Sequence, residues 1–461
     1  MYQQKQVERS VFRAYDIRGI IGKELDVNDF YTIGRAISCR LHALNRQKIF
    51  IARDGRLTSD DLAEALKQGL LDSGITVIDL GAAATPVMYY AVNSTDIDSG
   101  LMVTGSHNPA DYNGIKMVLA GKTLVQSDID EIYNLVEAGV FQDGQGESLA
   151  RDLMSDYIQR IVGDIKLDRR LKVVVDCGNG IAGPVIPKVI EALGCEVIPL
   201  FCDVDGRFPN HHPDPTIEAN LVDLKATVAQ HKADIGLAFD GDADRLGVIT
   251  DQGQVIWPDR LLMLYALDVL QRKPGSTIVY DVKCSSHLAR VVKEAGGVAK
   301  MCPTGHSIVK GVMKEENAAL AGEMSGHLFF KDRWYGFDDA LYSACRLLEI
   351  LSQSPQSASE QFAVIPDSIN TPEIKIPIAE AEKFAFMRRF SEQARFPDAK
   401  IITIDGLRVE FANGWGLLRA SNTTPCLVAR FEAEDKATLE EIQILFKTQL
   451  QRLDKGLVVS F

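Results

Sequence analysis

Three stretches of the chain share one pattern: an apolar run ending in aspartate, a stretch of helical length, a glycine and a second short apolar run. They read IFIARD to GITVID from residue 49, KVVVD to GCEVIPL from residue 172, and TIVYD to GGVAKM from residue 277. Each connection is long enough for a helix between two parallel strands, and such crossovers are almost always right-handed. We therefore expect three βαβ units, with binding residues in the loops where the strands end.

The pattern changes after about residue 366. PEIKIPI, KIITIDGLRVEF, GWGLLRA and PCLVARFEA are typical of strands, AEAEKFAFMRRFSEQA of a helix, and a last helix is expected from Lys436. Strands joined by short turns favour an antiparallel α+β domain. The predicted fold is thus α/β: three similar α/β domains with mixed or parallel sheets over residues 1–150, 151–255 and 256–365, and a C-terminal α+β domain over 366–461.

Charge, hydropathy and cysteine usage exclude several classes of protein. A net charge of −13 and a pI near 5.2 argue against a nucleic-acid partner, which needs a basic surface. No segment reaches the ~18 apolar residues of a membrane helix, and MYQQKQVERS lacks a signal-peptide core. The eight cysteines show no C-x-x-C or zinc spacing and suit a reducing compartment, so we expect a cytoplasmic protein.

A turn after the apolar strand GLMV carries Ser106 and His107 in the sequence TGSHNPADYNG. The serine is not in the G-x-S-x-G elbow of the α/β-hydrolases, because Asn108 stands at the position of the second glycine. Gly, Asn and Pro all favour turns, so a plain turn with an incidental hydroxyl is the alternative.

A second loop, DIGLAFDGDADRLGVIT, alternates Asp240, Asp242 and Asp244. An extended segment would direct all three carboxylates to one side, where a divalent cation would neutralise them. The loop differs from an EF-hand, because its sixth position is Arg245 and its twelfth is Asp251. A metal site is favoured over a solvated acidic turn.

Two further loops carry groups suited to sugar and phosphate. AALAGEMSGHLFF places Glu323, Ser325 and His327 in a glycine-flanked turn, where a carboxylate and a hydroxyl can bind vicinal sugar hydroxyls. GWGLLRASNTTPCLVARF places an arginine fork beside hydroxyl and amide donors, which can hold a phosphate. The alternatives are a polar turn and an ordinary hairpin. The candidate phosphate-binding residues of the GWGLLRASNTTPCLVARF loop are Arg419, Ser421, Asn422, Thr423 and Thr424.

Taken in order, these loops resemble the α-D-phosphohexomutase superfamily, and most closely its bacterial phosphomannomutase/phosphoglucomutase branch. The resemblance rests on FRAYDIRG from Phe12, TGSHNPADYNGIK, DGDADR, GEMSGH and RASNTT, and it runs through the whole chain. It implies a phosphoserine domain, a metal-binding domain, a sugar-recognition domain and a phosphate-binding domain, the last with a fold like the TATA-box-binding protein.

The resemblance also implies roles for individual residues. Ser106 would be a phosphoserine and, with Asp240, Asp242 and Asp244, would bind one Mg²⁺. Residues implied around the transferring group are Arg18, His107, Lys116, Arg245, His306 and His327. Implied substrate contacts are Tyr15, Lys283, Glu323, Ser325, His327, Arg419, Ser421, Asn422 and Thr423, with Thr424 in the same loop.

In the implied reaction, phosphoserine 106 lends its phosphoryl group to a hexose 1- or 6-phosphate, giving a 1,6-bisphosphate that turns around and returns its other phosphate. Glucose and mannose phosphates would both serve, glucose 1,6-bisphosphate would activate, the partners would be small sugar phosphates only, and a monomer is expected. The last domain would close as a lid, with a hinge near residue 366.

Four alternatives to a dual-specificity mutase remain. A glucose-only phosphoglucomutase is disfavoured by the sugar loop GEMSGH. A phosphoglucosamine mutase is disfavoured because that branch reads SASHNP and GEQSGH where this chain has TGSHNP and GEMSGH. A non-catalytic sugar-phosphate-binding protein is disfavoured because Ser106 and the three aspartates are all present. A phosphatase would differ only in letting water reach the phosphoserine.

Overall fold

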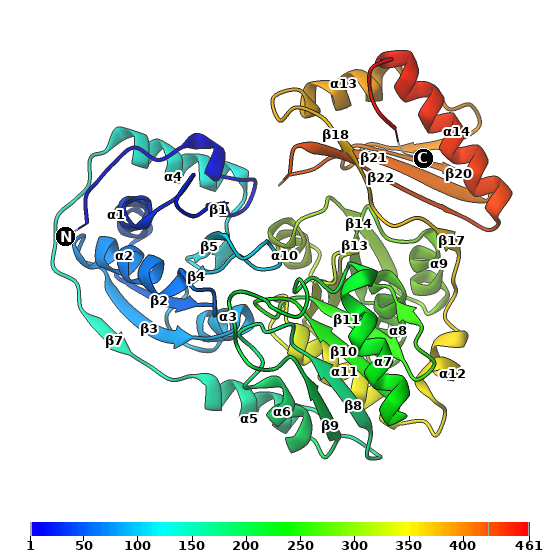
Figure 1. Cartoon of the computed structure of the whole chain (residues 1–461), viewed down its shortest axis with the longest axis horizontal. Coiled ribbons are helices and arrows are strands. Elements are labelled where there is room, and N and C mark those ends of the chain that lie inside the picture. Colours follow the sequence, from blue (N-terminus) through cyan, green and yellow to red (C-terminus); the bar gives the residue numbers. More distant parts are fainter. Residues whose placement is uncertain (1, 423, 460) are drawn as a thin grey trace.

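The computed structural model describes residues 2–422, 424–459 and 461. Four sheets follow one another along the chain, and Figure 1 shows the first at the left, the next two below, and the last at the upper right. No helix within these residues is both long and apolar enough to pass through a bilayer.

The first domain has a mixed sheet of seven strands in the order β1-β5-β4-β2-β3-β7, with β6 beside β5. β5 runs antiparallel to β4 and β1, and the remaining neighbours on the main path are parallel. α1, α2 and α4 pack on one face and α3 on the other. The elements are η1 (Arg9–Val11), β1 (Ile17–Ile20), α1 (Val27–Ala43), β2 (Lys48–Arg53), α2 (Ser59–Leu71), β3 (Thr76–Ala82), α3 (Thr85–Ser94), β4 (Gly100–Val103), β5 (Tyr112–Leu119), β6 (Lys122–Thr123), α4 (Gln126–Ala138) and β7 (Ser148–Ala150).

The second domain has a five-stranded sheet in the order β12-β11-β10-β8-β9. β9, β8 and β10 are parallel, and β11 and β12 continue antiparallel. The elements are α5 (Met154–Asp164), β8 (Lys172–Asp176), α6 (Ile186–Ala192), β9 (Glu196–Leu200), η2 (Glu218–Leu221), α7 (Val222–His231), β10 (Ile235–Phe239), β11 (Leu246–Thr250) and β12 (Val255–Ile256).

The third domain has a four-stranded sheet in the order β14-β13-β15-β16, in which only β16 is antiparallel to its neighbour. The elements are α8 (Pro258–Arg272), β13 (Thr277–Asp281), α9 (Ser286–Glu294), β14 (Val298–Cys302), α10 (His306–Glu315), β15 (Leu320–Gly322), β16 (Leu328–Phe330), α11 (Ala340–Ser352) and α12 (Ala358–Ala363).

The fourth domain has an antiparallel sheet in the order β17-β22-β21-β20-β19, with β18 also on β22. α13 and α14 cover it on the side away from the third domain (Figure 1). The elements are β17 (Ile369–Asn370), β18 (Ile374–Pro377), α13 (Lys383–Gln393), β19 (Lys400–Ile402), β20 (Leu407–Phe411), β21 (Gly414–Ala420), β22 (Cys426–Ala433) and α14 (Lys436–Leu453). The predicted change to α+β structure after about residue 366 is confirmed.

The three predicted βαβ units are present. β2 with β3, β8 with β9, and β13 with β14 are parallel neighbours, joined by α2, α6 and α9 respectively. Their three aspartates are all buried: Asp54 directly follows β2, whereas Asp176 and Asp281 end β8 and β13. The carboxyl ends of these strands therefore carry polar groups in every unit.

Local sequence explains where the main helices begin and which face they bury. Asp26 caps α1 by accepting hydrogen bonds from the N–H groups of Asn28 and Asp29. Along the same helix Phe30, Ile33 and Ile37 recur every three or four residues and are fully buried, along with Leu41. Capping aspartates also begin α11 and α14, at Asp339 and Asp435.

The hydrophobic core joins three domains and leaves the fourth separate. One buried cluster runs from α3 through the second domain into the third, whereas the fourth domain has a core of its own. The fourth domain rests on the loop after β13, where Arg408 donates to the carbonyls of Val282 and Cys284, each at 2.7 Å. Trp415 packs there against Val282. This loop therefore anchors the last domain.

Candidate active site

Ser106 lies in a tight, buried turn after β4. Its backbone is left-handed, with φ of 49°, and its side chain is almost fully buried. The hydroxyl Oγ donates to Asp240 Oδ2 at 3.1 Å and lies 3.1 Å from His107 Nδ1. The turn predicted from sequence is thus joined directly to the predicted metal loop, and the alternative of an incidental surface hydroxyl does not fit this burial.

Two residues that the sequence analysis missed hold this turn. The Arg56 guanidinium donates to the backbone oxygens of Ser106 at 2.8 Å and Asn108 at 2.6 Å. Asp54 accepts hydrogen bonds from Thr104 Oγ1 at 2.7 Å and from the Gly105 N–H at 3.2 Å. The signal was present in RDGR, because Asp54 ends the first repeated strand pattern.

Asp240, Asp242 and Asp244 meet in the loop between β10 and β11, each with an oxygen within 4.8 Å of the others. The predicted extended segment is wrong: the loop is a turn, with Ala243 at φ of 60°. Asp240 Oδ1 stabilises this turn by accepting the N–H groups of Asp244 at 3.0 Å and Arg245 at 3.1 Å. The carboxylates therefore converge through chain reversal and not through strand alternation.

Gly241 allows the acidic loop to reach the serine turn. A Cβ at this position would lie 2.5 Å from the Ser106 carbonyl oxygen, closer than packed atoms permit. Only glycine gives this close approach of two backbones. The contact brings the first and second domains together at the point where Ser106 meets Asp240.

Lys116, on β5, is the cation closest to the acidic loop. Its Nζ forms ion pairs with Asp242, at 2.7 Å, and with Asp244. The attraction of these carboxylates outweighs burial and raises the pKa of Lys116. Burial, followed by repulsion from Asp244 and Asp242, raises the pKa of Asp240 well above its usual range.

The acidic loop suits a divalent cation. Asp242 Oδ1 is buried and accepts no hydrogen bond from the residues that the structure describes, whereas Asp244 Oδ1 faces His327 Nε2 at 3.3 Å. Buried carboxylate oxygens without donors are costly unless a cation binds them, and oxygen ligands suit hard cations such as Mg²⁺. Together with Asp240 and the Ser106 hydroxyl, they can form a metal site.

Arg18 and Arg245 flank the serine turn. Arg18 donates to the Gly105 carbonyl at 2.9 Å and to Asn108 Oδ1 at 2.6 Å. Arg245 pairs through its backbone with His327 across the second and third domains, and its Nε lies 3.4 Å from His327 Nε2. Both guanidinium groups therefore lie where charge on a phosphoryl group would need compensation.

His306 begins α10 with its ring beside Tyr15 and His327, at centroid distances of 5.0 and 5.6 Å. Neither ring nitrogen has a hydrogen-bond partner among the described residues, although the ring is buried. Burial, followed by the charges of Lys310 and Lys116, lowers the pKa of His306 well below its usual range. The neutral form of the ring is therefore favoured, and proton uptake by it is made less favourable.

The predicted sugar loop lies beside these rings. Glu323 Oε1 accepts the Gly305 N–H at 2.7 Å, and Oε2 lies 3.1 Å from His327 Nδ1. Ser325 Oγ lies 2.9 Å from the same nitrogen. Burial opposes the charged ring, but Asp244 and Glu323 outweigh it and raise the pKa of His327 to about 9.

Arg419, on β21, forms a second group with the turn that follows it. Its Nε donates to Asp405 at 2.9 Å, whereas its buried Nη2 has no hydrogen-bond partner among the described residues. Ser421 Oγ lies 2.7 Å from Thr424 Oγ1. Asn422 belongs to this turn, and the predicted contact Thr423 lies outside the described residues.

Lys283 lies on the third domain and makes an ion pair with Glu373 at 2.6 Å. Burial lowers its pKa, but the charges of Glu373 and Asp281 outweigh burial and raise it. Tyr15 lies within electrostatic range of Asp16, Glu323 and Arg419; burial, followed by Asp16 and Glu323, raises its pKa to about 12. Glu373 and Asp405 could not be found from sequence, because each meets its partner only in the folded chain.

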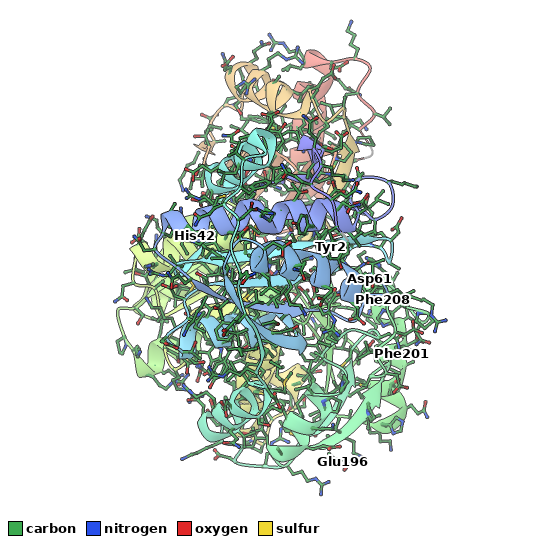
Figure 2. The ribbon with its side chains drawn as sticks, turned by 90° about the vertical axis from the view of Figure 1, so that its left-hand side faces the viewer. Tyr2, His42, Asp61, Glu196, Phe201 and Phe208 are labelled. Atoms are coloured by element: carbon green, nitrogen blue, oxygen red, sulfur yellow. The ribbon has the colours of Figure 1, made fainter. Side chains whose placement is uncertain are left out.

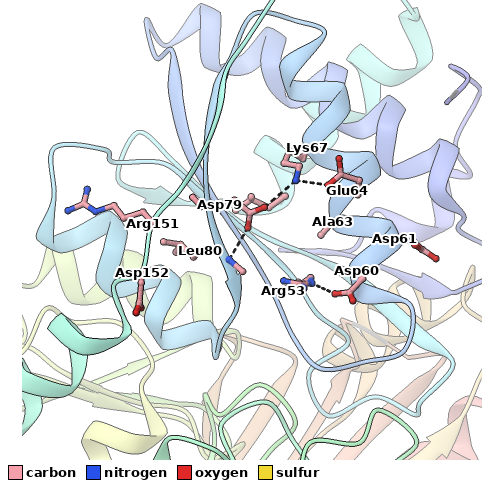
Figure 3. Close-up of a pocket in the computed structure, with 13 residues that line it drawn as sticks. Arg53, Asp60, Asp61, Ala63, Glu64, Lys67, Asp79, Leu80, Arg151 and Asp152 are labelled. Carbon is pink, nitrogen blue, oxygen red and sulfur yellow. Dashed lines mark hydrogen bonds and ion pairs between the residues drawn. The ribbon is translucent and has the colours of Figure 1, made fainter.

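A separate polar groove of about 750 Å³ lies on the first domain between α2, β3 and the segment around β7 (Figure 3). Two of its cations are paired: Lys67 binds Glu64 and Asp79, and Arg53 binds Asp60. None of the predicted site residues lines it. The groove is therefore not the candidate active site.

Comparison with known proteins agrees with this arrangement. Four family descriptions match in order: phosphoglucomutase/phosphomannomutase alpha/beta/alpha domains I, II and III over residues 9–143, 155–253 and 257–368, and the C-terminal domain over 373–446. The chain belongs to the phosphoglucomutase/phosphomannomutase family.

Similar proteins carry names of both activities. A phosphomannomutase/phosphoglucomutase of Pseudomonas putida is 53% identical over 98% of each chain. A phosphoglucomutase of Neisseria meningitidis serogroup A is 51% identical over 96% of this chain and 97% of its own. The crystal structure of a phosphoglucomutase/phosphomannomutase family protein of Burkholderia thailandensis, 48% identical, superposes with a TM-score of 0.94 over 99% of this chain and all of that one.

Proposed function

We propose that this protein interconverts hexose 1-phosphates and hexose 6-phosphates, acting on both mannose and glucose. The observation that carries the proposal is the buried Ser106 hydroxyl, which lies 3.1 Å from Asp240 in a loop where the buried Asp242 Oδ1 has no donor among the described residues. A serine in this setting suits a phosphoserine, whose charge of about −2 requires nearby cations. The names of similar proteins support the same reaction.

The non-reacting phosphate and the sugar ring of the substrate would bind to two different groups of residues. The unpaired Nη2 of Arg419 suits the phosphate that does not react, because guanidinium–phosphate hydrogen bonds are charge-assisted. Glu323 and Ser325 suit the 3- and 4-hydroxyls of the hexose. These contacts would place the free hydroxyl of the substrate near Ser106.

In the transfer step, the free sugar hydroxyl attacks the phosphorus carried by Ser106, and the bond between phosphorus and Ser106 Oγ breaks. Phosphoryl transfer depends mainly on positioning and on charge stabilisation. Arg18, Arg245 and Lys116 supply positive charge around the turn. The attacking hydroxyl must also lose its proton to a base, for which His306, whose ring nitrogens have no partner among the described residues, is the candidate.

Asp240, Asp242 and Asp244, with the serine oxygen, would hold one Mg²⁺, which supplies further positive charge at the phosphoryl group. Glu323 and Ser325, which would bind the 3- and 4-hydroxyls of the sugar, would bind them again in the return step. The 1,6-bisphosphate turns around within the site and gives its other phosphate back to Ser106. Glucose 1,6-bisphosphate would activate the enzyme by phosphorylating Ser106.

The test is a mutase assay with glucose 1-phosphate and mannose 1-phosphate, each with and without glucose 1,6-bisphosphate. Both sugars should turn over with kcat/KM within about tenfold. Intact-mass spectra should show a phosphorylated fraction that Ser106→Ala abolishes together with activity. Three results would each reject this function. They are a preference for glucosamine phosphate, release of inorganic phosphate as fast as the sugar phosphate is isomerised, and full activity of Ser106→Ala.

A further inference from the structure

Two cysteines of the second domain lie in contact beside the active site. Cys177 follows β8 and Cys202 lies just beyond β9, on adjacent parallel strands, and their Sγ atoms are 3.6 Å apart. Cys177 is buried and Cys202 is partly exposed. Among the eight cysteines only Cys39, in the first domain, is similarly accessible.

The backbone positions suit a covalent bond between these cysteines. The two cysteines follow the ends of the parallel neighbours β8 and β9, where the Cys177 N–H donates to the Leu200 carbonyl at 3.1 Å. The sulfur atoms need to close from 3.6 Å to a bond of about 2 Å. Closing this gap draws the turn after Cys177 and the loop that carries Cys202 toward each other.

The two thiols differ in reactivity. The hydrogen bond with Cys202, together with burial, raises the pKa of Cys177 well above its usual range. The same hydrogen bond lowers the pKa of Cys202 against the effect of burial. Cys202 is also the partly exposed thiol, so that a hydroperoxide reaches it first, and the buried Cys177 is placed to resolve it.

We propose that Cys177 and Cys202 form a reversible disulfide when the protein meets a hydroperoxide, and that this bond slows phosphoryl transfer. The Cys202 thiolate attacks the peroxide, becomes a sulfenic acid and releases the alkoxide, which is protonated to the alcohol. Cys177 then attacks the sulfenic sulfur; the S–S bond forms and hydroxide leaves, taking up the Cys177 proton as water. Two thiols are oxidised, the peroxide is reduced, and a thiol reductant reverses the bond.

The turn after Cys177 links the pair to the metal loop. Asn179 donates its backbone N–H to the Phe201 carbonyl at 2.8 Å, and Ile181 donates to the Gly241 carbonyl at 3.1 Å. Gly241 is the residue that packs against the Ser106 carbonyl. A movement of Cys177 is therefore passed to the contact between Ser106 and the acidic loop.

The segment after Cys202 reaches the serine turn from the other side. A Cβ on Gly206 would lie 2.7 Å from Arg56 Cα, and the Phe208 ring lies 5.1 Å from the Arg56 guanidinium. Figure 2 shows Phe201 and Phe208 on one edge of the molecule, at the junction of the first two domains. Because Arg56 holds the Ser106 carbonyl, both ends of the disulfide act on the same turn.

The experiment treats the full-length protein with tert-butyl hydroperoxide, blocks free thiols, and maps peptides without reduction. We expect a peptide that joins Cys177 to Cys202 and is lost after dithiothreitol. The fall in kcat, which rests on the proposed mutase function, should be about tenfold, since displacement of a reacting group by ~1 Å can cost up to a hundredfold. Dithiothreitol should restore the rate.

Cys202→Ser should abolish the linked peptide and keep its full rate in peroxide, and Cys177→Ser should do the same. The matched control Cys39→Ser removes the other accessible thiol and should behave as wild type. Free Cys177 and Cys202 thiols under conditions that oxidise Cys39 would overturn the proposal. A linked peptide with unchanged kcat would overturn its regulatory part. Absence of mutase activity before oxidation would reject the proposed function, while the peptide map still decides whether the bond forms.

Discussion

Arg419 gives the sharpest test of how the non-reacting phosphate is held. Its Nε is fixed by Asp405 at 2.9 Å, which leaves the buried Nη2 as the donor available to a ligand. A hydrogen bond between charged groups contributes about 1.5 to 3 kcal/mol. Arg419→Ala should therefore raise KM by about 10- to 150-fold, since each 1.4 kcal/mol corresponds to a factor of ten.

The fold should tolerate this change. Asp405 keeps its hydrogen bond from the Thr304 N–H at 3.1 Å, and its side chain is 17% exposed, so water can replace the lost guanidinium. Because the contact is made in both the ground state and the transition state, kcat should change much less than KM. An unchanged melting temperature would show that the domain is intact.

The assay measures initial rates over a wide range of glucose 1-phosphate at saturating glucose 1,6-bisphosphate. The control is Arg388→Ala, which removes the same charge from an exposed position of α13 in the same domain. Arg388→Ala should leave KM within about twofold, as is usual for surface substitutions. A KM of Arg419→Ala within about threefold of wild type, or an equal effect of both variants, would refute the reasoning, because the minimum expected loss is about 1.5 kcal/mol.

Three other results are expected. Asp242→Asn should weaken Mg²⁺ binding, measured calorimetrically, and lower kcat; turnover that survives exhaustive chelation would contradict the metal site. Glu323→Ala should lower kcat/KM about tenfold or more for both sugars, whose 3- and 4-hydroxyls are alike, and a selective loss for one sugar would contradict shared recognition. Burial raises the pKa of Asp339 to about 7 from 3.8, so its favourable contribution to folding is complete below pH 3.8 and is lost as pH rises through 7. Asp339→Asn should flatten the pH dependence of denaturant unfolding by up to about 1.4 kcal/mol per pH unit, whereas parallel profiles would disprove the assignment.

The sequence predicted what depends on local pattern. The strand and helix periods placed all three βαβ units, and the last helix begins at Lys436 as expected. The grouping of Asp240, Asp242 and Asp244 was also predicted, but for the wrong geometric reason. A left-handed residue at Ala243 turns the chain, and an alanine gives no sequence signal for such a backbone.

The partners that position the site were not predictable in the same way. Arg56 holds a turn 50 residues away in sequence, and Lys283 pairs with Glu373 at a separation of 90 residues. Such contacts depend on how whole domains pack. Many other residues of the same types occur in the sequence, and each is an equally good candidate for the partner. Only the folded chain distinguishes them.

The aspartates at the strand ends were predictable from the local sequence pattern, and they also make contacts that only the folded chain shows. Asp54 binds the backbone of the serine turn, and Asp281 accepts the Met324 N–H of the sugar loop at 3.2 Å. Asp176 accepts the Gly178 N–H at 2.9 Å in the turn that leads from Cys177 to the metal loop. A buried carboxylate that accepts loop donors fixes the loop without any contact with substrate. The repeated aspartates thus also stabilise the serine turn, the sugar loop and the turn that contacts the metal loop.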